Sequence, residues 1–258
     1  MKRESFGSRL GFILVSAGCA IGIGNVWKFP YICGAYGGAA FILIYLCFLV
    51  ILGIPVLVAE FAVGRGSHTS VAKCFDKLAP AGSGWKPLKF IGIIGCYMLM
   101  MFYTTVGGWM IYYCVKSLRG DFVGATPEAV TQSFSDMLGN APTMMLWMVI
   151  ICLIGFAVCF MGLQNGIEKI SKVMMSALLI IMVILAVHSV MMEGAGEGIR
   201  FYLIPDFQKI KEAGVGNVVF AALSQSFFTL SIGIGAMLIF GSYLDKSRSL
   251  TGEAVSIT

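Results

Sequence analysis

The chain has 258 residues, of which 58% are apolar and 12% are charged, and its formal net charge is +5. A mean hydropathy of +0.89 exceeds what the core of a soluble domain needs, which excludes a soluble globular protein. In a soluble protein the basic excess would indicate a nucleic-acid partner, whereas here it follows from the placement of lysine and arginine in loops. We therefore expect a polytopic membrane protein whose partner is the lipid bilayer and not a nucleic acid.

Apolar segments recur along the chain at lengths that span about 30 Å of hydrocarbon. None has the short apolar core and small-residue cleavage site of a signal peptide, so we expect the first segment to be retained. The predicted spans are residues 10–32, 39–63, 90–116, 143–160, 173–192 and 221–235. The predicted connections are cytoplasmic at 67–89 and 161–172 and external at 117–142 and 193–216, the last with two helical stretches.

The first span contains three closely spaced glycines, Gly18, Gly22 and Gly24, followed by Asn25. Glycine costs roughly 1 kcal/mol against alanine inside a helix, so a local break is expected here. The alternative is close helix packing, for which the spacing of Gly18 and Gly22 is also typical. Asn25 favours a break that lines a site, because a buried amide needs a partner and its oxygen suits a cation such as sodium.

The last span repeats this pattern, with polar side chains followed by closely spaced glycines. Ser224, Gln225, Thr229 and Ser231 lie along it, and Gly233 and Gly235 follow within the same apolar run. Two broken spans that open successive blocks are typical of transporters built from inverted repeats, in which the interrupted helices frame the site.

Basic residues indicate the topology. Twelve of the eighteen lysines and arginines fall in one alternating set of loops: Lys2, Arg3, Arg9, Arg65, Lys73, Lys77, Lys86, Lys89, Lys169, Lys172, Lys246 and Arg248. The positive-inside rule then places the N-terminus in the cytoplasm of a multi-pass protein of the inner (plasma) membrane.

One intramembrane carboxylate, Glu60, lies near the inner edge of the hydrocarbon. It either extends to water or pairs inside the bundle, and pairing is slightly favoured. No histidine, serine or cysteine lies at catalytic spacing from it, so the sequence does not support an enzyme.

Three stretches, residues 22–30, 53–65 and 224–235, resemble the signatures of the neurotransmitter:sodium symporter family, which includes bacterial amino-acid transporters such as the leucine transporter. The resemblance implies an all-α membrane protein with a leucine-transporter-like inverted-repeat fold, in which the first and sixth transmembrane helices are unwound at mid-membrane. Residues 1–192 would form the first five-helix repeat. Residues 193–258 would form an extracellular loop, the sixth helix and the incomplete start of the second repeat.

The resemblance also implies two sodium sites. The first would use the Ala20 carbonyl, the Asn25 side chain, and both the carbonyl and the hydroxyl of Thr229. The second would use the carbonyls of Gly18 and Ile21, with its remaining ligands on a later span. Neutral oxygens freed by a kink suit sodium.

A substrate site is implied beside the first sodium ion. The Ile23 and Gly24 amides and the Tyr103 hydroxyl would bind a substrate carboxylate at the N-terminus of a half-helix. The groups that would meet the ammonium are the carbonyls of Ala20, Phe228 and Thr229 and the hydroxyl of Ser231. The apolar lining would consist of Leu99, Tyr103, Phe228 and Ile234, which fits a hydrophobic or aromatic amino acid.

Gate residues follow from the same resemblance. Lys28 stands where relatives often have an arginine of the outer gate, and lysine keeps the charge but loses the bidentate fork. Arg3, Phe6 and Tyr243 resemble the cytoplasmic gate. The chloride site of animal members is matched in part by Tyr45, Gln225 and Thr229, and chloride dependence is left open.

These features together predict a sodium-coupled symporter of a hydrophobic or aromatic amino acid that works by alternating access and is represented here by a partial chain. Two alternatives stay open. One is a membrane fragment that transports nothing, and the other is a six-span protein that forms a homodimer to complete the bundle.

Overall fold

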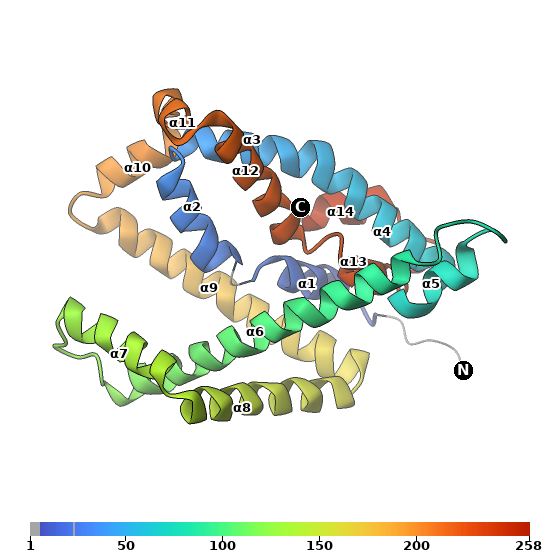
Figure 1. The fold of residues 1–258 in the computed structure, drawn as a ribbon, viewed down its shortest axis with the longest axis horizontal. Helices are drawn as coiled ribbons and strands as arrows, with labels where there is room; N and C mark the ends of the chain where they lie inside the picture. Colours follow the sequence, from blue (N-terminus) through green and yellow to red (C-terminus); the bar gives the residue numbers. More distant parts are fainter. Residues whose placement is uncertain (1–5, 23) are drawn as a thin grey trace. The chain divides into compact units, whose positions relative to one another are not determined.

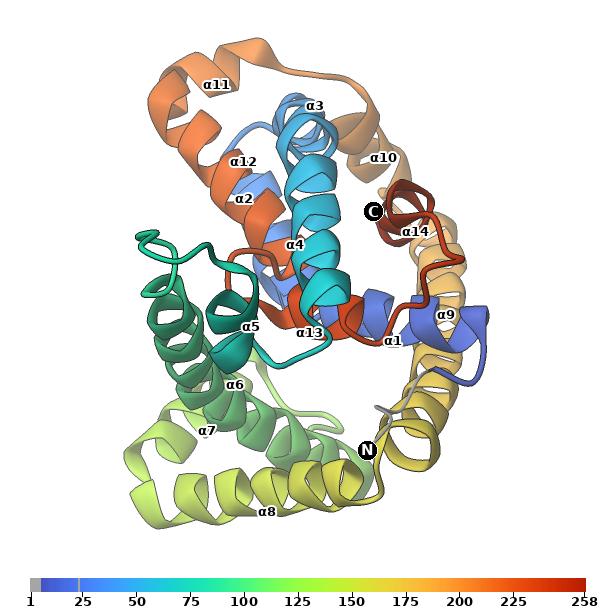
Figure 2. The ribbon, with the colours of Figure 1, turned by 90° about the vertical axis from the view of Figure 1, so that its right-hand side faces the viewer.

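The computed structural model describes residues 6–22 and 24–258, and this described part is mostly helical. Two predicted site residues, Arg3 and Ile23, lie outside the described residues. The chain divides into two compact units. The first unit comprises the described residues up to Ile93 together with Leu163–Thr258, and the second unit is Ile94–Gly162 (Figures 1 and 2).

The first predicted span is broken, as the glycine pattern indicates. Helix α1 (Arg9–Ala20) ends at Ile21, whose ψ of 89° is not helical. The chain resumes in the π-helix η1 (Gly24–Lys28) and continues in α2 (Phe29–Ala35). The helices on the two sides of the break are bent by 52° relative to each other.

The second span is one helical run with an internal π-helical segment, made of α3 (Ala39–Phe48), η2 (Leu49–Gly53) and α4 (Ile54–Ser67). The π-helix directly precedes Pro55, which cannot donate a backbone hydrogen bond. The following connection, expected to be a loop, contains a short amphipathic helix, α5 (Val71–Leu78).

The second unit holds most of α6 (Leu88–Arg119), α7 (Pro127–Gly139) and α8 (Ala141–Phe160). Helix α7 was not expected in the connection at residues 117–142. It begins where the Thr126 side chain accepts a hydrogen bond from the Ala129 N–H, and Pro127 occupies the first turn. Gly108 lets α6 approach α8, because a Cβ there would lie 2.9 Å from the Met148 nitrogen.

The turn predicted at residues 161–172 is wrong. Helix α8 ends at Phe160, Gly162 adopts a φ of 83°, and helix resumes at once as η3 (Leu163–Glu168) and α9 (Lys169–Met191). The connection at residues 193–216 then carries α10 (Ala195–Leu203) and α11 (Phe207–Ala213), which confirms the two helical stretches expected there.

The last predicted span is broken as well. Helix α12 (Val215–Leu230) ends at Ser231, and the chain turns through Gly233 and Gly235 before α13 (Ala236–Gly241) and α14 (Leu250–Ile257). The φ angles of Ser231, Gly233 and Gly235 are 52°, 89° and 78°, a left-handed backbone that a continuous helix does not allow.

The core of the first unit lies where α3 and α4 run beside α12 and α13, and α9 runs beside α1 (Figures 1 and 2). Its largest fully buried side chains include Phe12, Phe41, Leu57, Phe61, Leu230 and Met237. Four helices of the described residues are long and apolar enough to cross a membrane. The number rises to six if two bent pairs each count as one span, namely Arg9–Ala20 with Gly24–Ala35 and Phe207–Ala213 with Val215–Leu230. The apolar windows of α8 and of Leu163–Met191 have no buried residue, as expected of a multi-pass membrane protein.

Helices α4 and α13 approach so closely that glycine is required on both. A Cβ on Gly64 would overlap the Leu238 carbonyl oxygen, and one on Gly241 would lie 2.7 Å from the Phe61 Cα. This contact fixes the position of the half-helix that follows the second break.

Gly64→Ala should therefore lower the thermal stability of the protein in detergent, by about 1–3 kcal/mol, as overpacking does. Gly155→Ala on α8 is the matched control, because a Cβ there meets open space. Equal unfolding temperatures for the two variants would contradict the packing.

Candidate functional site

The two breaks meet at Thr229, the side chain that joins the most elements of the candidate site. Its Oγ1 donates to Asn25 Oδ1 at 3.1 Å, so α12 is tied to η1. The same oxygen accepts from the Tyr45 hydroxyl at 3.1 Å and lies 3.4 Å from Gln225 Nε2. The three residues that resemble part of a chloride site are thus brought together.

Backbone carbonyls at the first break take part in the same network. Asn25 Nδ2 donates to the Ala20 carbonyl at 3.2 Å, and Gln225 Nε2 donates to the Gly24 carbonyl at 3.3 Å. The predicted first sodium ligands Ala20, Asn25 and Thr229 therefore lie in one chain of hydrogen bonds. Their oxygens are neutral and hard, so the donor set fits sodium.

A second contact ties the end of α1 to the break after α12. Ser231 Oγ donates to the Cys19 carbonyl at 2.8 Å. Because Ser231 adopts a left-handed conformation, its side chain leaves the helix where α12 stops. The residue predicted to meet the substrate ammonium thus lies beside the last turn of α1.

Phe228 lies directly against Gly24. A Cβ on Gly24 would overlap the Phe228 ring, so only glycine fits at that position. The Lys28 ammonium lies 5.1 Å from the centroid of the same ring, within the range of a cation–π contact. Lys28, the predicted outer-gate residue, thus covers a predicted pocket residue.

Glu60 satisfies the N–H groups that the second break frees. Its carboxylate accepts from the Gly233 N–H at 2.5 Å and from the Leu238 N–H at 3.2 Å. The half-helix α13 therefore receives its negative N-terminal cap from α4. Pairing inside the bundle, the slightly favoured alternative for Glu60, is confirmed, and the partners are backbone groups.

Two of the predicted gate residues, Phe6 and Tyr243, make an aromatic contact. The Phe6 ring lies edge-on to the Tyr243 ring at 5.9 Å and to the Phe12 ring at 5.3 Å. These contacts bring the start of the described chain to the end of α13.

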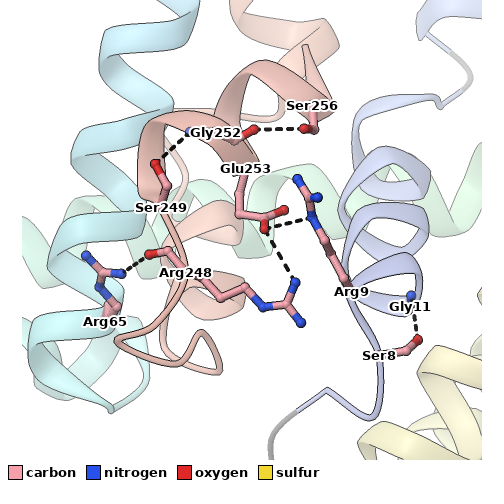
Figure 3. Close-up of polar contacts among 9 residues, drawn as sticks. All are labelled: Ser8, Arg9, Gly11, Arg65, Arg248, Ser249, Gly252, Glu253 and Ser256. Carbon is pink, nitrogen blue, oxygen red and sulfur yellow. Dashed lines mark hydrogen bonds and ion pairs between the residues drawn. The ribbon is translucent and has the colours of Figure 1, made fainter.

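Beside this contact lies a charged cluster that the sequence did not indicate (Figure 3). Glu253, which is 3% exposed, pairs with Arg9 at 3.1 Å and with Arg248 at 3.6 Å. Arg65 donates to the Arg248 carbonyl at 2.7 Å. The Glu253 carboxylate, shared by two arginines, joins α14 to α1. The Arg65 hydrogen bond joins α4 to the same cluster.

For other predicted residues the structure gives only their place in the chain or one neighbour. Gly18 faces Met175 of α9, and Ile21 ends α1, so their part in a second sodium site stays a prediction. Ile234 lies in the turn between α12 and α13. Leu99 and Tyr103 lie on the part of α6 within the second unit, and their place around the substrate also stays a prediction.

Glu60→Leu should destabilise the protein, because it leaves the Gly233 and Leu238 N–H groups without their acceptor. The expected loss is about 1–3 kcal/mol for each unsatisfied group, and Glu60→Gln, which keeps an acceptor oxygen, should lose less. Thermal unfolding in detergent measures this, with Glu128→Leu in the first turn of α7 as the control. If Glu60→Leu were as stable as the control variant, the capping role would be wrong.

The sequence profile of the sodium:neurotransmitter symporter family matches residues 3–132 and 128–258. The chain is 36% identical over 99% of its length to an uncharacterized sodium-dependent transporter, YhdH, of Bacillus subtilis, and covers 56% of that protein. It is 29% identical over 93% of its length to the sodium-dependent serotonin transporter of Drosophila melanogaster, covering 44% of it.

A solved structure, that of MhsT in complex with L-phenylalanine, matches with a TM-score of 0.89 and 37% identity. The match covers 99% of this chain and 57% of that one, and the chain spans about half the length of the relatives that it matches. This likeness confirms the predicted leucine-transporter-like fold. The relatives are named as transporters and not as enzymes, and the chain belongs to the sodium:neurotransmitter symporter family.

Proposed function

We propose that the protein is a sodium-coupled symporter of a hydrophobic or aromatic amino acid and that it works by alternating access. The observation that carries the proposal is the contact of Thr229 with Asn25, which joins the two broken helices at neutral oxygen atoms. The L-phenylalanine in the related MhsT structure supports an aromatic or hydrophobic substrate.

Sodium in the first site would be held by the Ala20 carbonyl, Asn25 Oδ1 and Thr229. The carbonyls of Gly18 and Ile21 would contribute to a second site. A bound cation supplies positive charge beside the substrate carboxylate, so that each offsets the cost of desolvating the other. This mutual stabilisation is the physical basis of coupling.

The substrate carboxylate would be bound by the Ile23 and Gly24 amides and the Tyr103 hydroxyl, and the ammonium by the Ser231 hydroxyl together with the backbone carbonyls predicted above. The side chains that would line the apolar pocket are Leu99, Tyr103, Phe228 and Ile234. Phe228 is supported best, because it already lies on Gly24 beneath the Lys28 ammonium.

Closure would take place at both ends of this site. Lys28 would close the outer side over Phe228, and Phe6 with Tyr243 and Arg3 would close the cytoplasmic side.

The proposal places the N-terminus in the cytoplasm and the protein in the plasma membrane, with residues 1–192 as the first repeat. Chloride binding at Tyr45, Gln225 and Thr229 is tested by replacing chloride in the uptake assay. A homodimer is tested by the molecular mass of the protein in detergent.

Asn25→Ala and Thr229→Ala should each weaken apparent sodium affinity by about tenfold or more, since each removes a polar ligand of a charged group. The measurement is sodium-dependent binding of labelled L-phenylalanine to proteoliposomes that contain the product of the complete reading frame. The matched controls are Asn217→Ala and Thr131→Ala, whose exposed side chains each donate a hydrogen bond to the backbone carbonyl four residues earlier. Unchanged sodium dependence in both site variants would refute the assignment.

Replacing sodium by choline should abolish amino-acid uptake into the same proteoliposomes, because the sodium gradient is the proposed driving force. Unlabelled hydrophobic and aromatic amino acids should compete with the labelled one, whereas aspartate and lysine should not, since an apolar pocket disfavours charge. Uptake that continued in choline, or equal competition by lysine, would contradict the proposal.

A further inference from the structure

The cytoplasmic half-helix α1 lacks an acidic residue of its own where one would be most favourable. Its first turn carries Arg9 and no aspartate or glutamate. A helix N-terminus has a partial positive charge and is stabilised by a nearby anion. The carboxylate that lies at this end belongs to Glu168, the last residue of η3, 161 positions from its contact Gly7.

Glu168 makes two hydrogen bonds to the start of α1. Its Oε2 accepts from the Gly7 N–H at 2.9 Å, and its Oε1 accepts from the Ser8 hydroxyl at 3.2 Å. Ser8 Oγ in turn accepts from the Gly11 N–H at 3.0 Å, which makes Ser8 the N-cap (Figure 3). The carboxylate of one span therefore supports the cap of another.

The surface of α1 leaves room for this carboxylate. A Cβ on Gly11 would overlap the Glu168 carboxyl group, and one on Gly7 would lie 3.6 Å from its oxygens. The Glu168 side chain is only 4% exposed, so these contacts replace water almost completely. Glycine at position 11 is thus required for the contact.

Glu168 has a second partner on its own span. Lys172, four residues later, places its ammonium 2.8 Å from Oε1 and is 37% exposed. If α1 moved away, this pair would remain, and the carboxylate would not be left buried without a counter-charge.

We propose that Glu168 is a positioning residue that holds α1 in its cytoplasm-closed position, and that Lys172 becomes its main partner when α1 moves away. The inference rests on the proposed alternating-access function. Helix α1 is suited to move as a unit, because its helical hydrogen bonds end at Ile21 and the helix after the break is bent by 52° relative to α1. Glu168 itself ends a π-helix, an element typical of functional sites.

The test is amide hydrogen exchange of residues 9–20 in the product of the complete reading frame, held in lipid nanodiscs with sodium and no amino acid. Glu168→Gln removes the charge, so exchange should be about tenfold faster. Gly11→Ala should have the same effect, because its Cβ displaces the carboxylate. Lys172→Gln should instead slow exchange, because the carboxylate would then have α1 as its main partner.

The opposite signs separate this proposal from a purely structural ion pair, in which removal of either partner would speed exchange. Glu128→Gln, which removes an exposed carboxylate in the first turn of α7, and Gly155→Ala should leave α1 unchanged. Unaltered exchange in both Glu168→Gln and Gly11→Ala, or faster exchange in Lys172→Gln, would overturn the proposal. If Glu168→Gln does not fold, Gly11→Ala and Lys172→Gln decide the question.

Because no amino acid is present, this result does not depend on transport. Failure of uptake together with the expected exchange pattern would refute the proposed function and leave the Glu168 contact supported as a clamp on α1. Normal uptake without that pattern would refute the further inference alone.

Discussion

The hydrocarbon of a membrane offers no water to a backbone that leaves its helix, and the first unit is organised around this constraint. Where α1 stops, its free carbonyls are bonded by the side chains of Asn25 and Ser231. Where α12 stops, the N–H groups of the turn and of α13 are bonded by Glu60. Polar side chains thus reach each break, and two of them, Asn25 and Ser231, also belong to the candidate site.

Glycine makes these contacts possible by bringing backbones close. Gly24 leaves room for the Phe228 ring, Gly11 leaves room for the Glu168 carboxylate, and Gly64 allows α13 to lie against α4. The close contacts between the segments around the two breaks therefore depend on glycine. Of the two alternatives that the spacing of Gly18 and Gly22 allowed, the structure shows the break in the first span. Close packing through glycine occurs elsewhere, between α4 and α13.

Local pattern predicted the spans and both breaks, because helix length, glycine spacing and polar residues at depth are visible along the chain. The family resemblance predicted residues that the fold brings together from distant positions, such as Asn25 and Thr229. The error at residues 161–172 arose because the polar composition of this stretch does not show that helix resumes directly after Gly162.

Three carboxylates, two of them buried and one half-buried, are harder to assign from the sequence. Glu60, Glu168 and Glu253 each bond to groups more than 150 residues away along the chain. Such partners are set by packing, so no local spacing reveals them. Once the fold is known they share a role, since each ties a half-helix or a helix end of the first unit to a neighbouring segment.

The most direct test of the central claim is a double-mutant cycle on sodium affinity with Asn25→Ala, Thr229→Ala and the double variant. If the two broken helices meet at one cation, the second substitution should cost much less when the first is present, so that the two effects are strongly non-additive. Simple addition of the two losses would mean that Asn25 and Thr229 act independently, and would contradict a shared sodium site.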